Sequence, residues 1–233
     1  LKTVTWTYVK DVAEPQLSME DVHHLVNVKR LVEGEGLVLS DGKGSWAEFV
    51  VTKVSKARDG GLSLERRGEI VVDPLPSYSV GVALFMPKLD RLSWAIQKMC
   101  EVGIDEIYLL SDAFDRRGGK PPSMDRLSRV LKEAGAQSRR SRLPLLDEVG
   151  GLNNLIELKE VALCDFNGGP LRSIHRTLVV GPESGLMSPR EPCEKVKLPG
   201  GVLRTETAAV VSAALLVALR ENLVGEIDKA WPI

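Results

Sequence analysis

The stretch from Leu178 to Leu216 places the strongest constraint on the fold of this chain. It opens with an apolar, β-branched run that stops at Gly181-Pro182, as a buried strand does at a turn. A second pair of glycines, Gly200-Gly201, precedes a segment that leads into a long apolar helix. Glycine lets the backbone approach a ligand without a Cβ in the way, so we expect these two loops to face each other across a cleft. Such a cleft suits an adenine and a ribose better than a bare phosphate.

Two common nucleotide-binding motifs are absent from the sequence. There is no GxxxxGK[ST] phosphate loop, and no GxGxxG follows a predicted strand. On the residues alone, two interpretations therefore stay open. The glycines either line a ligand site or serve only the geometry of a strand–turn–helix connection.

Composition excludes several other classes of protein. A chain of 233 residues that is 43% hydrophobic and 27% charged can bury a sizeable core, as one large domain or two modest ones. The longest apolar run, Ala208 to Leu219, is too short to cross a bilayer, and we see no signal peptide after Leu1. The three cysteines are far apart and no Cys/His cluster accompanies them. We therefore expect no metal site and no membrane, and unpaired thiols in a reducing cytoplasm.

The charge of the chain is unevenly distributed. Between Arg116 and Arg142 nine basic residues face only Asp125 and Glu133, a net charge of +7 within a chain of net charge −1. A local basic field in a near-neutral protein is typical of a polyanion binder. A solvated helix face is the alternative, but the scarcity of acids favours nucleic acid.

Hydrophobic patterns divide the chain into two parts. Residues 1–70 predict a small β-barrel, with a helical turn from Ser18 to Val28 and strands at 4–9, 36–42, 45–54 and 62–70. A proline-containing linker at 71–79 follows. The second part predicts strands at 79–87, 106–112, 161–166 and 177–180, with helices at 88–103 and from Ser123 to about Arg142. This strand–helix–strand order predicts a parallel sheet.

Several motifs together resemble the RsmE family of SPOUT-class methyltransferases. GPESG (181–185), Glu191 and LPGGVLRTETA (198–208) stand where that family has its C-terminal signature. The segments at 87–107 and 133–144 resemble two further family motifs, and His24-Leu25 to Gly44 resembles a third. The resemblance implies an α/β SPOUT domain with a trefoil knot at 73–233, preceded by a PUA-like β-barrel RNA-binding domain at 1–72.

The activity implied by this resemblance is methylation of N3 of a specific uridine in small-subunit (16S) ribosomal RNA. S-adenosyl-L-methionine is the implied cofactor, and a cytoplasmic homodimer acting on ribosomal RNA or the ribosomal subunit is the implied assembly. Two alternatives within this fold stay open: a non-catalytic RNA-binding relative, or a methyltransferase acting on a different RNA. A third alternative sets the resemblance aside and takes the chain as an α/β nucleotide-binding protein with a basic face.

The resemblance also implies which residues form the sites. The cofactor residues are Val180, Gly181, Pro182, Glu183, Gly185, Leu198, Gly200, Val202, Leu203 and Arg204. No residue stands out as a general base, and the catalytic candidates are Arg204 as electrostatic support and Glu183 as an orienting carboxylate. The RNA phosphate candidates are Arg139, Arg140 and Arg142, with Arg30 from the barrel. The chain departs from the family at Ser184, Pro199 and Gly201, within the implied cofactor and RNA sites.

Overall fold

A computed structural model describes residues 4–55, 61–111, 122–182, 185, 189–190 and 192–225. These residues form two compact units. The first unit comprises the chain up to Leu75 together with Lys132–Leu143, and the second comprises Pro76–Leu131 with the chain from Pro144. Each unit is described by itself below.

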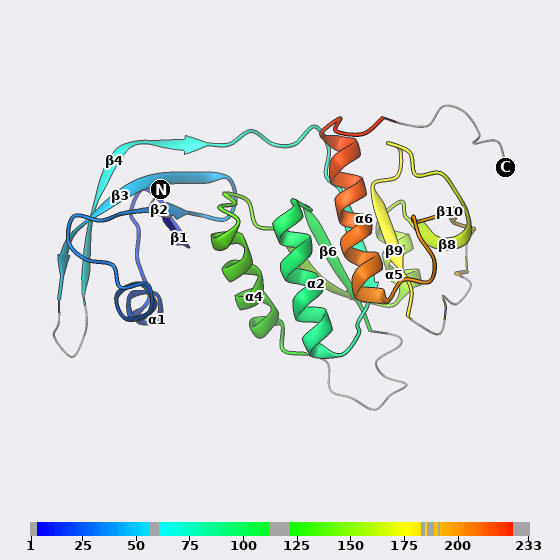
Figure 1. Ribbon diagram of the computed structural model, residues 1–233, viewed down its shortest axis with the longest axis horizontal. Helices are drawn as coiled ribbons and strands as arrows, with labels where there is room; N and C mark the ends of the chain where they lie inside the picture. Colours follow the sequence, from blue (N-terminus) through cyan, green and yellow to red (C-terminus); the bar gives the residue numbers. More distant parts are fainter. Residues whose placement is uncertain are drawn as a thin grey trace. The chain divides into compact units, whose positions relative to one another are not determined.

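The first unit is built on a four-stranded sheet (Figure 1). Its strands are β1 (Thr5–Tyr8), β2 (Gly36–Ser40), β3 (Ser45–Val54) and β4 (Leu62–Val72), in the order β1-β2-β3-β4. β1 runs parallel to β2, and the other pairs are antiparallel. The predicted hairpin between β2 and β3 is present. Asp41 Oδ1 accepts hydrogen bonds from the N–H groups of Lys43 (2.7 Å) and Ser45 (3.0 Å), which closes the turn.

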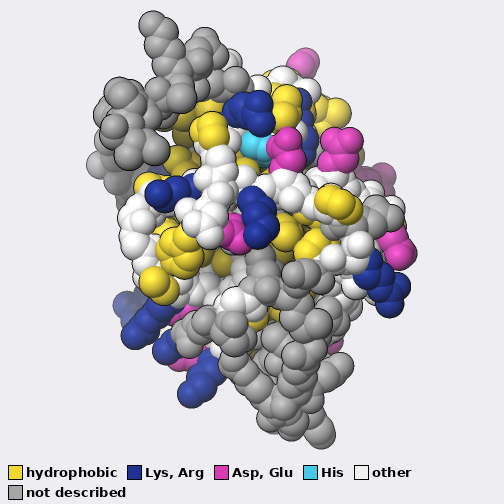
Figure 2. Space-filling model, turned by 90° about the vertical axis from the view of Figure 1, so that its right-hand side faces the viewer, with side chains coloured by type: hydrophobic (Ala, Val, Ile, Leu, Met, Phe, Trp, Pro, Cys, Tyr) yellow, Lys and Arg dark blue, Asp and Glu magenta, His cyan; other side chains and the backbone are white. Residues whose placement is uncertain are grey.

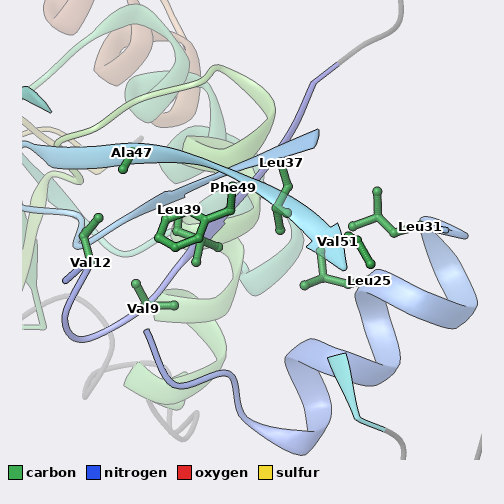
Figure 3. Packing of buried hydrophobic residues seen from close by; sticks show 9 residues of the cluster. All are labelled: Val9, Val12, Leu25, Leu31, Leu37, Leu39, Ala47, Phe49 and Val51. Carbon is green, nitrogen blue, oxygen red and sulfur yellow. The ribbon is translucent and has the colours of Figure 1, made fainter. Parts of the chain in front are cut away.

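The core of the first unit lies on one face of this sheet. Alternate residues of β2 and β3 point to this face, including Leu37, Leu39 and Phe49, and they meet Leu25 from the helical segment (Figure 3). That segment consists of α1 (Met19–His23) and the π-helical turn η1 (His24–Val28). It begins at Ser18, as predicted, and Ser18 and Asp21 form the reciprocal hydrogen bonds of a complete capping box.

The segment Lys132–Leu143 packs against the second face of the sheet. This face is defined here by Trp6, Tyr8, Val38, Ser40 and Trp46. Tyr8 donates its hydroxyl hydrogen bond to the Arg140 carbonyl oxygen at 2.7 Å. The Ser40 hydroxyl donates to the Ser141 carbonyl oxygen at 3.0 Å. Although it follows β6 in the sequence, this segment is thus packed within the N-terminal unit.

Helix α4 (Met124–Gln137) ends earlier than the sequence predicts. The prediction extended it to about Arg142, but Arg139 adopts the left-handed conformation, with φ 57°. Arg140 N–H bonds the Gly135 carbonyl at 2.9 Å, and Arg139 N–H bonds the Ala136 carbonyl at 3.4 Å. This is the Schellman pattern, in which glycine usually holds the position that Arg139 takes here. All three arginines proposed for RNA binding in this segment therefore follow the helix.

The second unit contains a six-stranded parallel sheet with the order β10-β8-β9-β5-β6-β7. Its strands are β5 (Gly81–Phe85), β6 (Glu106–Leu110), β7 (Leu145–Gly150), β8 (Ala162–Gly169), β9 (Thr177–Val180) and β10 (Glu194–Val196). Its other helices are α2 (Leu89–Val102), α5 (Leu152–Leu158) and α6 (Thr205–Arg220). The parallel α/β sheet and the separate β-rich unit confirm the predicted fold class, whereas the trefoil knot stays a prediction. The predictions omitted β7, α5 and β10.

Helices cover both faces of this sheet (Figure 1). On one face, Phe85 and Tyr108 belong to a buried cluster that includes Leu152 and Leu155 of α5. On the other face, α2 and α6 lie side by side. Cys164 of β8 and Ser212 of α6 are in contact there, with Sγ and Oγ 3.6 Å apart. Burial raises the pKa of the Cys164 thiol to about 11, so this thiol is neutral at physiological pH.

Candidate functional site

The carboxyl edge of the parallel sheet carries the first of the two predicted loops. β9 ends at Val180 and continues into Gly181-Pro182, and the neighbouring β5 ends at Phe85 before α2 begins. β6 and β7 lie on one side of β5, while β8, β9 and β10 lie on the other. Ligands of open α/β sheets bind at the carboxyl ends of strands where the strand order reverses in this way. The topology therefore selects the loop after β9 independently of any motif.

One hydrogen bond brings the two predicted loops together. The Thr205 hydroxyl donates to the Gly181 carbonyl oxygen at 3.0 Å. Thr205 is the first residue of α6, and Arg204, at the end of the second loop, is its N-cap residue. The first N–H groups of an α-helix have no partner within the helix, so they offer donors to a ligand at this edge.

One glycine in each loop has a backbone conformation that favours glycine. Gly185 and Gly200 both have φ of 88°, where a side chain would be strained. Gly185 closes a turn by donating its N–H to the Pro182 carbonyl at 2.9 Å. In the second loop Leu198 and Leu203 are half-buried, whereas Val202 is 88% exposed. Glu183, one of the two catalytic candidates, lies outside the described residues.

A buried carboxylate at this edge was missed by the sequence prediction. Glu206, in the first turn of α6, has a side chain only 10% exposed, and its Oε1 is 3.6 Å from Nε of Arg91 in the first turn of α2. Among the described residues, its Oε2 is buried without a hydrogen-bond partner. Glu206 was not among the site residues that the sequence predicted. The structure adds a cation, Arg91, that the sequence gave no reason to select.

The RNA phosphate candidates differ in what their side chains contact. Arg30 and Arg139 are exposed, and both have φ of 57°. Arg140 is half-buried. The Arg142 guanidinium donates to the carbonyl oxygen of Lys43 and, at 2.8 Å, to that of Asp73. Arg142 thus holds the β2–β3 hairpin in place, which leaves less of its guanidinium fork for a phosphate than the sequence suggested.

A second polar cluster, also absent from the sequence prediction, ties down the edge strand β10. His175 is buried, and its Nδ1 accepts the N–H of Arg172 at 2.9 Å. The ring proton is therefore on Nε2, which donates to Glu194 of β10 at 2.6 Å. This hydrogen bond is the main cause that holds the pKa of the Glu194 carboxyl below its usual value. The cluster fixes the strand that leads into the second loop.

The surface around β8 and β10 is mixed in character. Figure 2 shows hydrophobic side chains lying among basic and acidic ones on this side of the second unit. Phe166 and Ile174 are each 58% exposed.

In the described part of the chain, no group of three or more His, Cys, Asp or Glu residues could hold a metal ion. No described helix is both long enough and apolar enough to span a bilayer.

Comparison with known proteins gives consistent matches for both units. Residues 73–217 match the family model described as RNA methyltransferase domain, and residues 17–58 match that described as RNA methyltransferase PUA domain. Ribosomal RNA small subunit methyltransferase E of Mycobacterium bovis is 32% identical over 218 residues, covering 81% of this chain and 80% of the relative. The Bacillus subtilis protein of that name is 28% identical over 159 residues, covering 66% of this chain but only 60% of its own length.

A solved structure supports the fold over nearly the whole chain. Ribosomal RNA small subunit methyltransferase E from Neisseria gonorrhoeae, bound to S-adenosyl methionine, matches with a TM-score of 0.74 and 21% identity. The match covers 93% of this chain and 98% of that protein. At this level of identity the likeness concerns the fold alone.

Proposed function

The chain belongs to the RNA methyltransferase family that includes ribosomal RNA small subunit methyltransferase E, and we propose that it methylates N3 of a specific uridine in small-subunit (16S) ribosomal RNA. S-adenosyl-L-methionine is its cofactor. The observation that carries this proposal is the hydrogen bond between Thr205 and Gly181, which joins the GPESG loop to the LRTETA helix at the switch point of the sheet. The mycobacterial and Bacillus relatives are named for action on the same class of RNA.

The residues at this edge fit a nucleoside cofactor. We assign Val180, Gly181, Pro182, Glu183 and Gly185 of the first loop, and Leu198, Gly200, Val202, Leu203 and Arg204 of the second, to its binding. Within the described part of the chain, the atom nearest to a Cβ added at Gly200 would be Leu203 Cδ2 at 3.9 Å, so a ligand could approach the backbone there. Apolar Leu198 and Leu203 can cover an adenine, while backbone groups provide donors and acceptors.

Methyl transfer to uracil N3 requires alignment and the loss of one proton. When bound, the cofactor supplies the methyl group as an electrophile. The protein contributes by holding N3 in line with it, which can lower the barrier by many kcal/mol without a covalent step. As N3 loses its proton, negative charge spreads to the base oxygens, and an adjacent cation stabilises it. We assign this role to Arg204, which is exposed at the start of α6, and to Arg91, which pairs with Glu206.

The two parts of the chain divide this work. We assign RNA binding to residues 1–72 as a PUA-like domain, and methyl transfer to residues 73–233 as a SPOUT domain with a trefoil knot. The match to the RNA methyltransferase PUA model supports the first assignment. A substrate of ribosomal RNA places the protein in the cytoplasm.

Two experiments distinguish the proposed function from three alternatives. The departures at Ser184, Pro199 and Gly201 favour, as second candidates, a non-catalytic RNA-binding relative or a methyltransferase for another RNA. Purified protein, labelled S-adenosylmethionine and small ribosomal subunits lacking the modification should give methyl transfer that maps to uridine N3. Transfer only to other RNAs would change the substrate, and cofactor binding without any transfer would contradict the proposal. If only ATP binds in calorimetry, the chain is instead a nucleotide-binding protein.

We propose that Arg139, which is exposed, and Arg140, which is half-buried, contact RNA phosphates after α4. Replacing Arg139 with glycine, which suits its φ of 57°, and Arg140 with glutamine should weaken RNA binding. Each lost phosphate contact should also lower the slope of log affinity against log salt by roughly 0.7–0.9. Binding titrations at several salt concentrations measure this, with Lys53→Gln on β3 as a control for an exposed charge elsewhere in the unit. If the folded double variant shows an unchanged salt slope, both arginines belong to a solvated surface and do not contact RNA phosphates.

We also propose a homodimer. Helix α6 buries Ala208, Ala213 and Leu216 within the second unit, yet Val211 and Leu215 are only half-buried. A second copy of the chain could cover this remaining apolar surface. Light scattering at micromolar concentration should give twice the monomer mass, and a monomeric mass would contradict the proposal.

A further inference from the structure

An aromatic pair lies on the second face of the N-terminal sheet, away from the core. Trp6 of β1 and Trp46 of β3 have ring centroids 5.7 Å apart, with planes tilted by 39°. Both side chains are half-buried, and neither belongs to the core cluster on the opposite face. Phe49, on the core face, is by contrast only 3% exposed. Part of the indole surface of the pair therefore remains open to solvent.

Asp73 fixes one ring of this pair and links it to the segment Lys132–Leu143. Trp46 Nε1 donates to Asp73 Oδ1 at 3.2 Å, and the other carboxylate oxygen accepts from the Ser141 hydroxyl. The Asp73 carbonyl accepts from the Arg142 guanidinium at 2.8 Å. These bonds hold the indole by its edge and occupy neither ring face, and they set it beside a segment rich in arginine.

The charges around the pair favour a polyanionic partner. The segment Lys132–Leu143 contains four basic residues and one acidic residue, Glu133. Within it Lys132 and Arg139 are exposed. On the second face itself, Glu48 is the register partner of Arg67 of β4, so a basic residue stands next to this acidic one. Exposed aromatic surface next to excess positive charge is the combination found in single-stranded nucleic-acid sites.

We propose that Trp6 and Trp46 form a stacking platform for an unpaired base of single-stranded RNA, while the neighbouring basic segment contacts its phosphates. The inference rests on the proposed function, because it takes RNA as the substrate. Every base has a π face, so stacking tolerates sequence. The platform accordingly holds a nucleotide that flanks the target uridine and does not select the uridine itself.

The fluorescence of the pair reports directly on such stacking. A variant with Trp94→Phe and Trp231→Phe leaves Trp6 and Trp46 as the only tryptophans. A short oligouridylate should quench its emission, whereas an abasic strand of the same length and charge should not. The oligouridylate should also bind roughly tenfold more tightly than the abasic strand, as expected for one stacked base.

Variants of each ring separate stacking from charge. Trp6→Ala should remove most of the preference for the oligouridylate while leaving the affinity for the abasic strand and the salt slope unchanged. Trp46→Phe keeps a ring but loses the bond to Asp73, so it should retain an intermediate preference. Trp94→Ala, made in the wild-type chain, alters a tryptophan that is 44% exposed on α2; it is the matched control and should bind both strands as the wild-type protein does.

The outcomes also separate this proposal from the proposed function. The platform is overturned if the wild-type protein binds the oligouridylate and the abasic strand equally well, or if Trp6→Ala keeps its preference for the oligouridylate. Either result counts even if subunit methylation proceeds normally. If the wild-type protein does not methylate the small subunit, the proposed function is overturned instead. If circular dichroism shows that Trp46→Phe does not fold, Trp6→Ala decides the question, because Trp6 takes no part in the bonds to Asp73.

Discussion

Replacing Gly181 with valine should raise the dissociation constant for S-adenosylmethionine by about 100-fold or more, a loss of roughly 3 kcal/mol of binding free energy. Gly181 follows the last residue of β9, and its carbonyl oxygen accepts the Thr205 hydroxyl that joins the two loops. A branched side chain would stand where the backbone has to approach the cofactor. It would also disturb the hydrogen bond that sets the loop against α6. Isothermal titration calorimetry measures the effect.

A matched glycine elsewhere controls for general damage. Among the described residues, a Cβ at Gly61, in the first unit, would meet Ser55 Cβ at 3.5 Å, an ordinary contact. Gly61→Val should therefore bind the cofactor as the parent does. If Gly181→Val folds normally and also binds with parental affinity, the cofactor site lies elsewhere.

Capping residues and glycines predicted most of the helices and strands, because such residues act on the backbone close to them in the sequence. Gly103 ends α2 with φ of 101°, and Ser18 caps α1 with its own side chain. The three elements that the sequence prediction omitted, β7, α5 and β10, lack such signals. β7 has two consecutive acidic residues, Asp147 and Glu148, β10 has three residues, and α5 has seven. The order of the sheet, with β9 beside β5, depends on contacts between distant segments and so could only be expected in outline.

Glycines in the sequence predicted the two loops of the candidate site. The parts of the site that depend on tertiary contacts could not be predicted in this way. Gly185 and Gly200 have the left-handed conformations that their loops need. The pairing of Arg91 with Glu206 depends on α2 and α6 starting at the same edge of the sheet. The role of Arg142 was likewise hidden, because the sequence shows its charge but not the carbonyl groups it contacts.

Replacing Arg220 with methionine should destabilise the second unit by about 3 kcal/mol. Arg220 ends α6, and its guanidinium pairs with Asp105, just before β6. The two side chains are only 7% and 16% exposed, so Arg220→Met would leave a largely buried carboxylate without its cation. Asp105 would keep one hydrogen bond, from the Val80 N–H at 2.9 Å. Urea denaturation of the variant should show a lower transition midpoint with a similar slope.

Two further variants test whether burial is the cause of this effect. Asp105→Asn combined with Arg220→Met removes both charges and should recover part of the lost stability, because breaking one partner of a buried pair costs more than replacing both. Lys98→Met breaks the pair with Glu101 on α2, whose side chains are 34% and 29% exposed, and should cost only about 0.5 kcal/mol. Equal losses for Arg220→Met and Lys98→Met would mean that burial adds nothing to the Asp105–Arg220 pair. The end of α6 would then be held mainly by the apolar packing of the helix against α2 and β5.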